Sequence, residues 1–198
     1  MKQIFNRQPK KLPETLEKGF FKNEKAKKYT RMAAALLTIA FIGVIWGHSM
    51  MPGSTSSGES GYITNLLNSI FGYEAVSEHL VRKVAHFTEY FLLSVLCLMN
   101  LLLCNNYTPF KEVKPNFLCF ALAFFKYLVR FLPALYVCLF VAVADESIQL
   151  FTVGRNGAIL DIWIDHIGSI TGYIVGILVY MFASLYLASN SIHTSGKQ

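Results

Sequence analysis

The sequence predicts an all-α integral membrane protein, a polytopic bundle of about four transmembrane helices. Of its 198 residues, 54% are apolar and 15% are charged, whereas soluble domains carry about 25% charged residues. The mean hydropathy is +0.42. Several apolar runs also reach the ~20 residues that a helix needs to cross a bilayer, and polar segments separate them. Together these observations argue against an ordinary soluble domain.

The first 31 residues form a basic segment that holds ten of the 18 lysine and arginine residues. The net charge of +6 is therefore concentrated just before an apolar run. This is typical of a juxtamembrane tail on anionic lipid and not of a nucleic-acid-binding surface. Residues 14–30 fit either a helix on the membrane surface or a solvated tail. We assign residues 1–31 to a cytoplasmic juxtamembrane tail, with membrane lipids and no nucleic acid as expected partners.

The first predicted span covers residues 32–51. It is longer than the apolar core of a signal peptide and lacks a small-x-small cleavage site, so we expect a retained helix. Residues 52–61 are rich in glycine and serine and predict a loop. Beyond them, apolar residues at spacings of three and four predict a short amphipathic helix at the membrane interface: Ile63, Leu66, Leu67, Ile70 and Phe71.

Three further spans are predicted at residues 84–104, 131–151 and 160–187. Pro133 suits the first turn of the middle one, because proline is favoured at the start of a helix. The glycine-containing residues 152–159 predict a tight loop between the last two spans.

The apolar segment 116–130 holds Lys126 and ends at Arg130. It fits a surface helix, the first part of a long helix or a fifth span. Residues 188–198 form a short polar C-terminal tail. The transmembrane domain is therefore predicted to cover residues 32–187.

Lysine and arginine counts predict the orientation, because cytoplasmic loops carry an excess of both residues. The N-terminal tail has ten and segment 105–130 has four. Segment 52–81 has none, and the 152–159 loop has one, Arg155. With four spans, this distribution places both termini in the cytoplasm. The two polar clusters described next then lie on the extracytoplasmic face.

One polar cluster begins the second span. Arg82, His86 and Glu89 share one helical stripe, and Lys83 and Tyr90 share the adjacent stripe with His86. A charge near the centre of a bilayer costs roughly 2.5–3.5 kcal/mol on insertion scales. Glu89 lies about two turns inside the helix and is therefore expected to face the bundle interior. We interpret this cluster as a working site, with a structural hydrogen-bond network between helices as the alternative.

The other polar cluster lies at the junction of the last two spans. Asp145 and Glu146 precede Gln149 by four and three residues, so its amide can reach both carboxylates. Arg155 follows in the loop and is suited to bind a phosphate or carboxylate group.

The last span carries two acids and three glycines on one face. The acids are Asp161 and Asp165, and Asp161 also fits a helix N-cap. Gly168, Gly172 and Gly176 are spaced by four residues, which lets a neighbouring helix approach closely. Such packing would press the two acids against that neighbour.

These clusters combine five acids, three bases and two histidines. Full ionisation in one low-dielectric space is unfavourable, so some acids stay protonated or a cation binds. A histidine beside a carboxylate is also a plausible acid–base pair. The candidate catalytic residues are His86, Glu89, Asp145 and Glu146. The candidate substrate-binding residues are Arg82, Lys83, Tyr90, Gln149, Arg155, Asp161 and Asp165.

We predict neither a metal nor another cofactor. The His86-x-x-Glu89 motif lacks the second histidine of a His-Glu-x-x-His zinc helix. The acids together with His166 are nevertheless of the type that can hold a divalent ion. No serine lies in a nucleophile-elbow motif.

Several motifs follow one another along the chain: His48-Ser49-Met50-Met51-Pro52-Gly53, Arg82-Lys83, His86-Phe87-x-Glu89-Tyr90, Asp145-Glu146-x-x-Gln149, Gly154-Arg155, and Asp161 before a glycine-bearing last helix. As an ordered set over about residues 32–187, they resemble the VanZ family of small bacterial membrane proteins. Family members often have Asn where this chain has Asp165, so this chain carries a further acid.

The resemblance implies a multi-pass protein of the bacterial plasma membrane that affects susceptibility to teicoplanin-type glycopeptide antibiotics. An outer-face polar site would bind or alter an envelope component, with a lipid-linked cell-wall precursor or another envelope anion as the candidate partner. The alternative is a membrane-embedded acid–base enzyme acting on such a precursor or on a phospholipid, with His86 as acid or base. Proton-coupled transport through the acids is a third reading.

Overall fold

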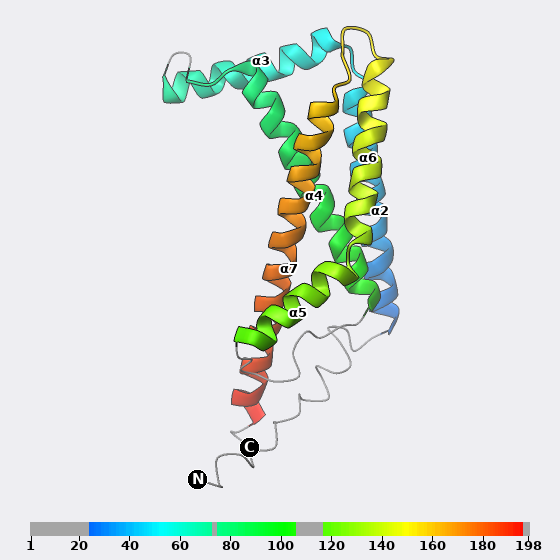
Figure 1. The fold of residues 1–198 in the computed structure, drawn as a ribbon, viewed down its shortest axis with the longest axis vertical. Coiled ribbons are helices and arrows are strands. Elements are labelled where there is room, and N and C mark those ends of the chain that lie inside the picture. The colour runs from blue at the N-terminus through cyan, green and yellow to red at the C-terminus, as the bar shows by residue number, and fades with distance from the viewer. Residues whose placement is uncertain (1–23, 73–74, 106–116, 196–198) are drawn as a thin grey trace.

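The computed structural model describes residues 24–72, 75–105 and 117–195 (Figure 1). Within these residues every regular element is a helix, which confirms the all-α prediction. In chain order the helices are α2 (Glu24–Ser49), α3 (Gly53–Phe71), α4 (Glu78–Asn105), α5 (Phe117–Arg130), α6 (Pro133–Leu150) and α7 (Ile159–Ser195).

Four of these helices are long and apolar enough to cross a membrane, as predicted. The candidate spans are Lys25–Ser49 of α2, Glu78–Cys104 of α4, Pro133–Leu150 of α6 and Ile159–Tyr186 of α7. Pro133 occupies the first turn of α6, also as predicted. α7 continues to Ser195, past the predicted end of the last span. Most of the predicted basic tail, residues 1–23, lies outside the described residues.

The segment predicted at residues 116–130 forms a separate short helix, α5. Its 14 residues give a length of about 21 Å, which is less than the ~30 Å hydrocarbon thickness. α5 lies obliquely against α7 (Figure 1). The ring centroids of Phe120 and Phe182 are 5.6 Å apart, and the Tyr173 hydroxyl donates to the Leu128 carbonyl oxygen at 2.7 Å. These contacts hold α5 on the bundle.

Residues 52–61 do not form the predicted loop, because α3 begins at Gly53. The serine-rich sequence is accommodated by hydroxyl groups that hydrogen-bond within the helix. Ser60 donates to the Ser56 carbonyl oxygen at 2.9 Å, and Thr64 donates to the Ser60 carbonyl oxygen at 2.7 Å. All three side chains are buried. Contact with the protein therefore stabilises a helix that local composition argues against.

The C-terminal half of α3 exposes large apolar side chains, and the helix lies across one end of the bundle, transverse to the spans (Figure 1). Its exposed apolar residues include Ile63, Leu66 and Ile70, which confirms the predicted amphipathic helix. An amphipathic helix in this orientation is suited to lie in the plane of a membrane interface. We call this end of the bundle the α3 end.

α4 and α7 pack closely through the predicted glycine face. A Cβ atom at Gly168 would collide with the carbonyl oxygen of Phe87, and one at Gly172 would collide with that of Phe91. Only a residue without a side chain permits this backbone separation. The contact fixes the height of α7 against α4, and with it the position of the acids at the start of α7.

At the α3 end, the C-terminus of α2 meets the segment between α6 and α7. The Gly53 amide donates to the Val153 carbonyl oxygen at 3.0 Å, and the Thr152 hydroxyl donates to the Ser49 carbonyl oxygen at 3.0 Å. At the opposite end, Arg31 donates to the Leu103 carbonyl oxygen at 2.9 Å. The start of α2 therefore lies beside the end of α4.

The glycine contact predicts that Gly172→Ala destabilises the protein. Overpacking a tight contact costs about 1–3 kcal/mol, so the thermal unfolding midpoint of the detergent-purified variant should fall. Gly47→Ala is the matched control, because a Cβ atom at Gly47 has no neighbour within 4 Å. Equal midpoints for the two variants would contradict the role assigned to this contact.

The orientation of the bundle stays a prediction, and cysteine labelling tests it. Ser57 is exposed at the α3 end, whereas the native Cys104 is exposed at the opposite end. A membrane-impermeant maleimide should label Ser57→Cys in intact cells. It should label the wild-type protein only after permeabilisation. Strong labelling of the wild type in intact cells would reverse the predicted orientation.

Candidate functional site

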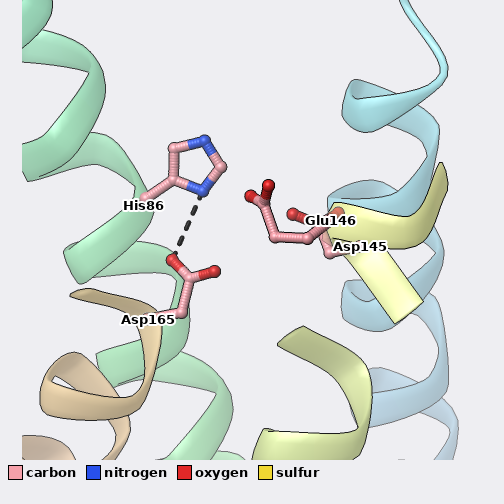
Figure 2. A group of neighbouring side chains, drawn as sticks. All are labelled: His86, Asp145, Glu146 and Asp165. Atoms are coloured by element: carbon pink, nitrogen blue, oxygen red, sulfur yellow. Dashed lines mark ion pairs between the residues drawn. The ribbon is translucent and has the colours of Figure 1, made fainter. Parts of the chain in front are cut away.

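Four titratable side chains from three helices converge near the α3 end (Figure 2). They are His86 from α4, Asp145 and Glu146 from α6, and Asp165 from α7. Each offers one nitrogen or oxygen atom to a common space, and these four atoms all lie within 4.8 Å of one another. The three carboxylic side chains are at most 3% exposed. We call these four residues the acid–histidine cluster.

Asp145 and Glu146 are held by hydrogen bonds from the protein. The Gln149 amide donates to Asp145 Oδ2 at 3.3 Å and to Glu146 Oε1 at 3.1 Å, as its spacing on α6 predicted. Ser49 Oγ donates to Asp145 Oδ1. The Ala158 backbone amide donates to Glu146 Oε2 at 2.7 Å. All four carboxylate oxygen atoms of this pair therefore accept a hydrogen bond.

Asp165 differs from the other two acids. Its side chain is completely buried, and neither carboxylate oxygen accepts a hydrogen bond from the described residues. Its nearest charged partner is His86, with 3.4 Å between Oδ1 and Nδ1. An unsatisfied buried carboxylate is costly. Within the described residues, Asp165 is therefore the acid of the cluster that faces His86 but accepts no hydrogen bond.

A cleft of about 200 Å³ opens beside the cluster at the α3 end. Its walls come from α3, the start of α4, the 151–158 segment and the start of α7. His86 belongs both to this cleft and to the acid–histidine cluster. The other basic residues on the walls are His79, Arg82, Lys83 and Arg155, and the acidic residue is Asp161.

Arg155 has a structural role in addition to its place in the cleft. Its Nε donates to the Met51 carbonyl oxygen at 3.1 Å, and its Nη2 donates to the His48 carbonyl oxygen at 3.0 Å. Burial, with the neighbouring charge of Arg82, lowers the pKa of Arg155, but a guanidinium stays protonated in proteins. Gly154 before it has φ = 73°, a conformation that favours glycine. This segment is therefore anchored to the end of α2.

Glu89 lies outside the acid–histidine cluster, against the end of α2. Its Oε1 is 3.8 Å from His48 Nδ1, and His48 Nε2 is 3.2 Å from Glu59 Oε2. Glu89 and His86 both line a smaller cavity of about 80 Å³. His48 and Ser49 were not among the predicted site residues. The signal available in the sequence was their place at the end of an apolar run that leads to the same face.

Two of the predicted binding residues lie behind the cleft. Tyr90 is fully buried in the apolar core, and Gln149 is buried against the two acids of α6. Asp161 lines the cleft. The N-cap prediction for Asp161 is wrong, because α7 begins at Ile159 and the Asp161 amide already donates to the Ala158 carbonyl oxygen at 2.9 Å.

The geometry gives the site two chemically different parts. The cleft presents cationic side chains that suit a phosphate or carboxylate group. The acid–histidine cluster behind it pairs an imidazole with a buried carboxylate, an arrangement that can orient a general acid or base or take up a cation. His86 connects the two parts.

Comparison with known proteins identifies the family of the transmembrane part. The profile of the VanZ/LLP1 family matches residues 34–182, which include the acid–histidine cluster and the residues of the cleft. A search of curated proteins and a search of solved structures returned no match.

The anchoring contacts of Arg155 predict that Arg155→Lys lowers stability. A lysine cannot reproduce the forked pair of hydrogen bonds, and losing bonds from a charged donor costs about 1–3 kcal/mol. The unfolding midpoint in detergent should therefore fall. Arg82→Lys in the same cleft is the control, since no hydrogen bond holds the Arg82 side chain in the described structure. A comparable loss in both variants would argue against the anchoring role.

Proposed function

This chain belongs to the VanZ/LLP1 family, and on that premise we propose a function for its cleft. The chain is a membrane protein with four candidate spans. We infer that it is a multi-pass protein of the bacterial plasma membrane whose cleft binds an anionic group of an envelope component. A lipid-linked cell-wall precursor is the candidate, because it presents phosphate at the membrane surface.

The observation that carries this proposal is the charge of the cleft wall. Arg82, Lys83 and Arg155 contribute three permanent positive charges, against one acid, Asp161. Arg82 and Lys83 stand at the start of α4, so their side chains lie near the end of the span. A lipid phosphate can reach that level without leaving the membrane, and arginine binds phosphate in a bidentate manner.

The orientation of the chain supports the same partner. The lysine and arginine distribution favours an extracytoplasmic α3 end. Glycopeptide antibiotics act outside the plasma membrane, on the face where the cleft would lie. Binding of an envelope anion there would change how a teicoplanin-type antibiotic reaches its target, in keeping with the resistance association of the family.

A membrane-embedded acid–base enzyme is the second candidate, and the position of His86 favours it. His86 Nδ1 faces Asp165, and the ring also lines the cleft. A buried carboxylate behind a histidine fixes the orientation of the ring and stabilises its protonated form. In this candidate His86 would exchange a proton with the bound lipid-linked precursor or phospholipid.

The proposal predicts the effect of removing charge from the cleft. In a susceptible Gram-positive host, expression of the wild-type chain should raise the inhibitory concentration of teicoplanin. The Arg82→Gln/Lys83→Gln variant should lose that protection, because it removes two of the three permanent positive charges. Inhibitory concentrations of teicoplanin and vancomycin are measured together with membrane levels by immunoblot.

Lys28→Gln, an exposed position at the opposite end of the bundle, controls for a general effect of lost basic residues and should protect like the wild type. Protection by the charge-depleted variant at wild-type membrane level would refute the cleft as the site. His86→Gln then separates the two candidates. Acid–base catalysis requires the imidazole and is abolished, whereas binding through Arg82, Lys83 and Arg155 is weakened but retained.

A further inference from the structure

We propose that His86, Asp145, Glu146 and Asp165 form a binding site for a divalent transition-metal cation, Zn²⁺ or Mn²⁺. The proposal concerns the acid–histidine cluster and not the cationic cleft. It does not depend on the proposed envelope function, because metal binding is measured on the purified protein.

The separation of the donor atoms fits a single ion. The four atoms lie within 4.8 Å of one another. The ligand atoms of a tetrahedral zinc ion are about 3.4 Å apart, because each bond is ~2.1 Å long. Side-chain movements of less than about 1 Å therefore bring all four atoms to bonding distance. The ligands come from α4, α6 and α7, so an ion would also tie three spans together.

The chemistry of the donors selects the class of ion. One imidazole nitrogen favours a first-row transition metal over Mg²⁺ or Ca²⁺, which prefer oxygen ligands. Three carboxylates favour a harder ion than the thiolate-rich sites do. Zn²⁺ and Mn²⁺ accept this mixture of ligands. The two buried cysteines, Cys97 and Cys138, lie outside the group of converging atoms.

Asp165 supplies an independent observation that a ligand belongs here. It is completely buried, accepts no hydrogen bond from the described residues, and points into the space shared with His86 and Glu146 (Figure 2). The His86 Nδ1 atom that faces it is likewise without a hydrogen bond. Buried polar groups in native proteins have partners. A cation between these two side chains would satisfy both of them.

The surrounding hydrogen bonds resemble those that orient metal ligands. Gln149, Ser49 and the Ala158 amide donate to the oxygen atoms of Asp145 and Glu146. A carboxylate has about four acceptor positions, so each remains able to bind an ion. Such outer hydrogen bonds fix ligating carboxylates and raise metal affinity.

The charge balance points the same way. Within the described residues, no lysine or arginine forms an ion pair with the three carboxylates, and the one ion pair that reaches them is made by His86. Arg155 donates instead to backbone carbonyl groups. A divalent ion would neutralise most of the charge that three carboxylates bring into the membrane region.

The test is the metal content of the full-length protein purified in detergent. The protein is stripped with EDTA, incubated separately with ZnCl₂, MnCl₂ or MgCl₂, freed of unbound ion by gel filtration, and analysed by mass spectrometry of the elements. The wild type should retain one Zn²⁺ or Mn²⁺ ion per chain, and that ion should raise its unfolding midpoint. Retention of Mg²⁺ in preference to both would overturn the assignment to a transition metal.

Asp165→Asn and His86→Gln should each lower the affinity by about tenfold or more and abolish the rise in midpoint. Glu59→Gln is the matched control, because this exposed acid at the same end also faces a histidine but lies outside the cluster. It should bind like the wild type. If Asp165→Asn does not elute as a folded protein, His86→Gln, at a partly exposed position, is compared with Glu59→Gln instead. Absence of retained metal in the wild type, or equal retention in the cluster variants, would overturn the proposal.

Discussion

The approach of α7 to α4 is the constraint on which the site depends. Gly168 lies directly against the backbone of Phe87, and this contact fixes both the distance and the relative height of the two helices. Asp165 is one turn before Gly168, and His86 is the residue before Phe87. The glycine contact therefore brings the carboxylate and the imidazole together. A larger residue at Gly168 or Gly172 would push α7 outward and separate the pair, even though neither glycine lines the cleft or belongs to the acid–histidine cluster.

A second constraint acts at the α3 end. The end of α2, the start of α3 and the 151–158 segment meet there, and their backbone groups must not be exposed to lipid. Arg155 meets it by donating to the carbonyl groups of His48 and Met51, in the last turn of α2 and just beyond it, where carbonyl groups lack the full set of helical partners. Its positive charge is thus used for structure as well as for the cleft. The basic residues of the cleft come from the 151–158 segment and the start of α4, whereas the buried acids lie behind them. Arg155 donates its hydrogen bonds to backbone carbonyl groups and not to a carboxylate. The cationic side chains of the cleft and the buried acids therefore lie close together without forming a salt bridge through Arg155.

Patterns that act within one helix were predictable from the sequence. The apolar runs gave the four spans, the spacing of Gln149 gave its contacts with Asp145 and Glu146, and the glycine spacing gave the packed face of α7. What failed depends on contacts between distant segments. Glycine and serine at residues 52–61 argue for a loop, but burial against the bundle makes a helix there. Tyr90 shares a stripe with His86, yet a stripe covers a wide angle, and Tyr90 points into the core. Periodicity gives the faces of a helix but not its rotation or height relative to its neighbours, so the partners of Arg155 and the part played by His48 could not be derived.

His86 belongs to both the acid–histidine cluster and the cleft, so binding at one is coupled to binding at the other. Its Nδ1 atom faces Asp165, while the opposite side of the ring points away from the acids (Figure 2). Whatever neutralises the carboxylates, a proton or a metal ion, therefore changes the charge that the imidazole presents to an anion in the cleft. Coupling between two binding events is reciprocal, so an anion bound in the cleft would alter the affinity of the cluster for a proton or a metal ion by the same factor. A metal ion bound to Nδ1 would hold the ring in a single orientation and place positive charge behind the cleft. An anionic lipid headgroup and a divalent cation would then strengthen each other's binding. This coupling requires the buried acids to lie beside the cationic cleft and not deeper in the membrane.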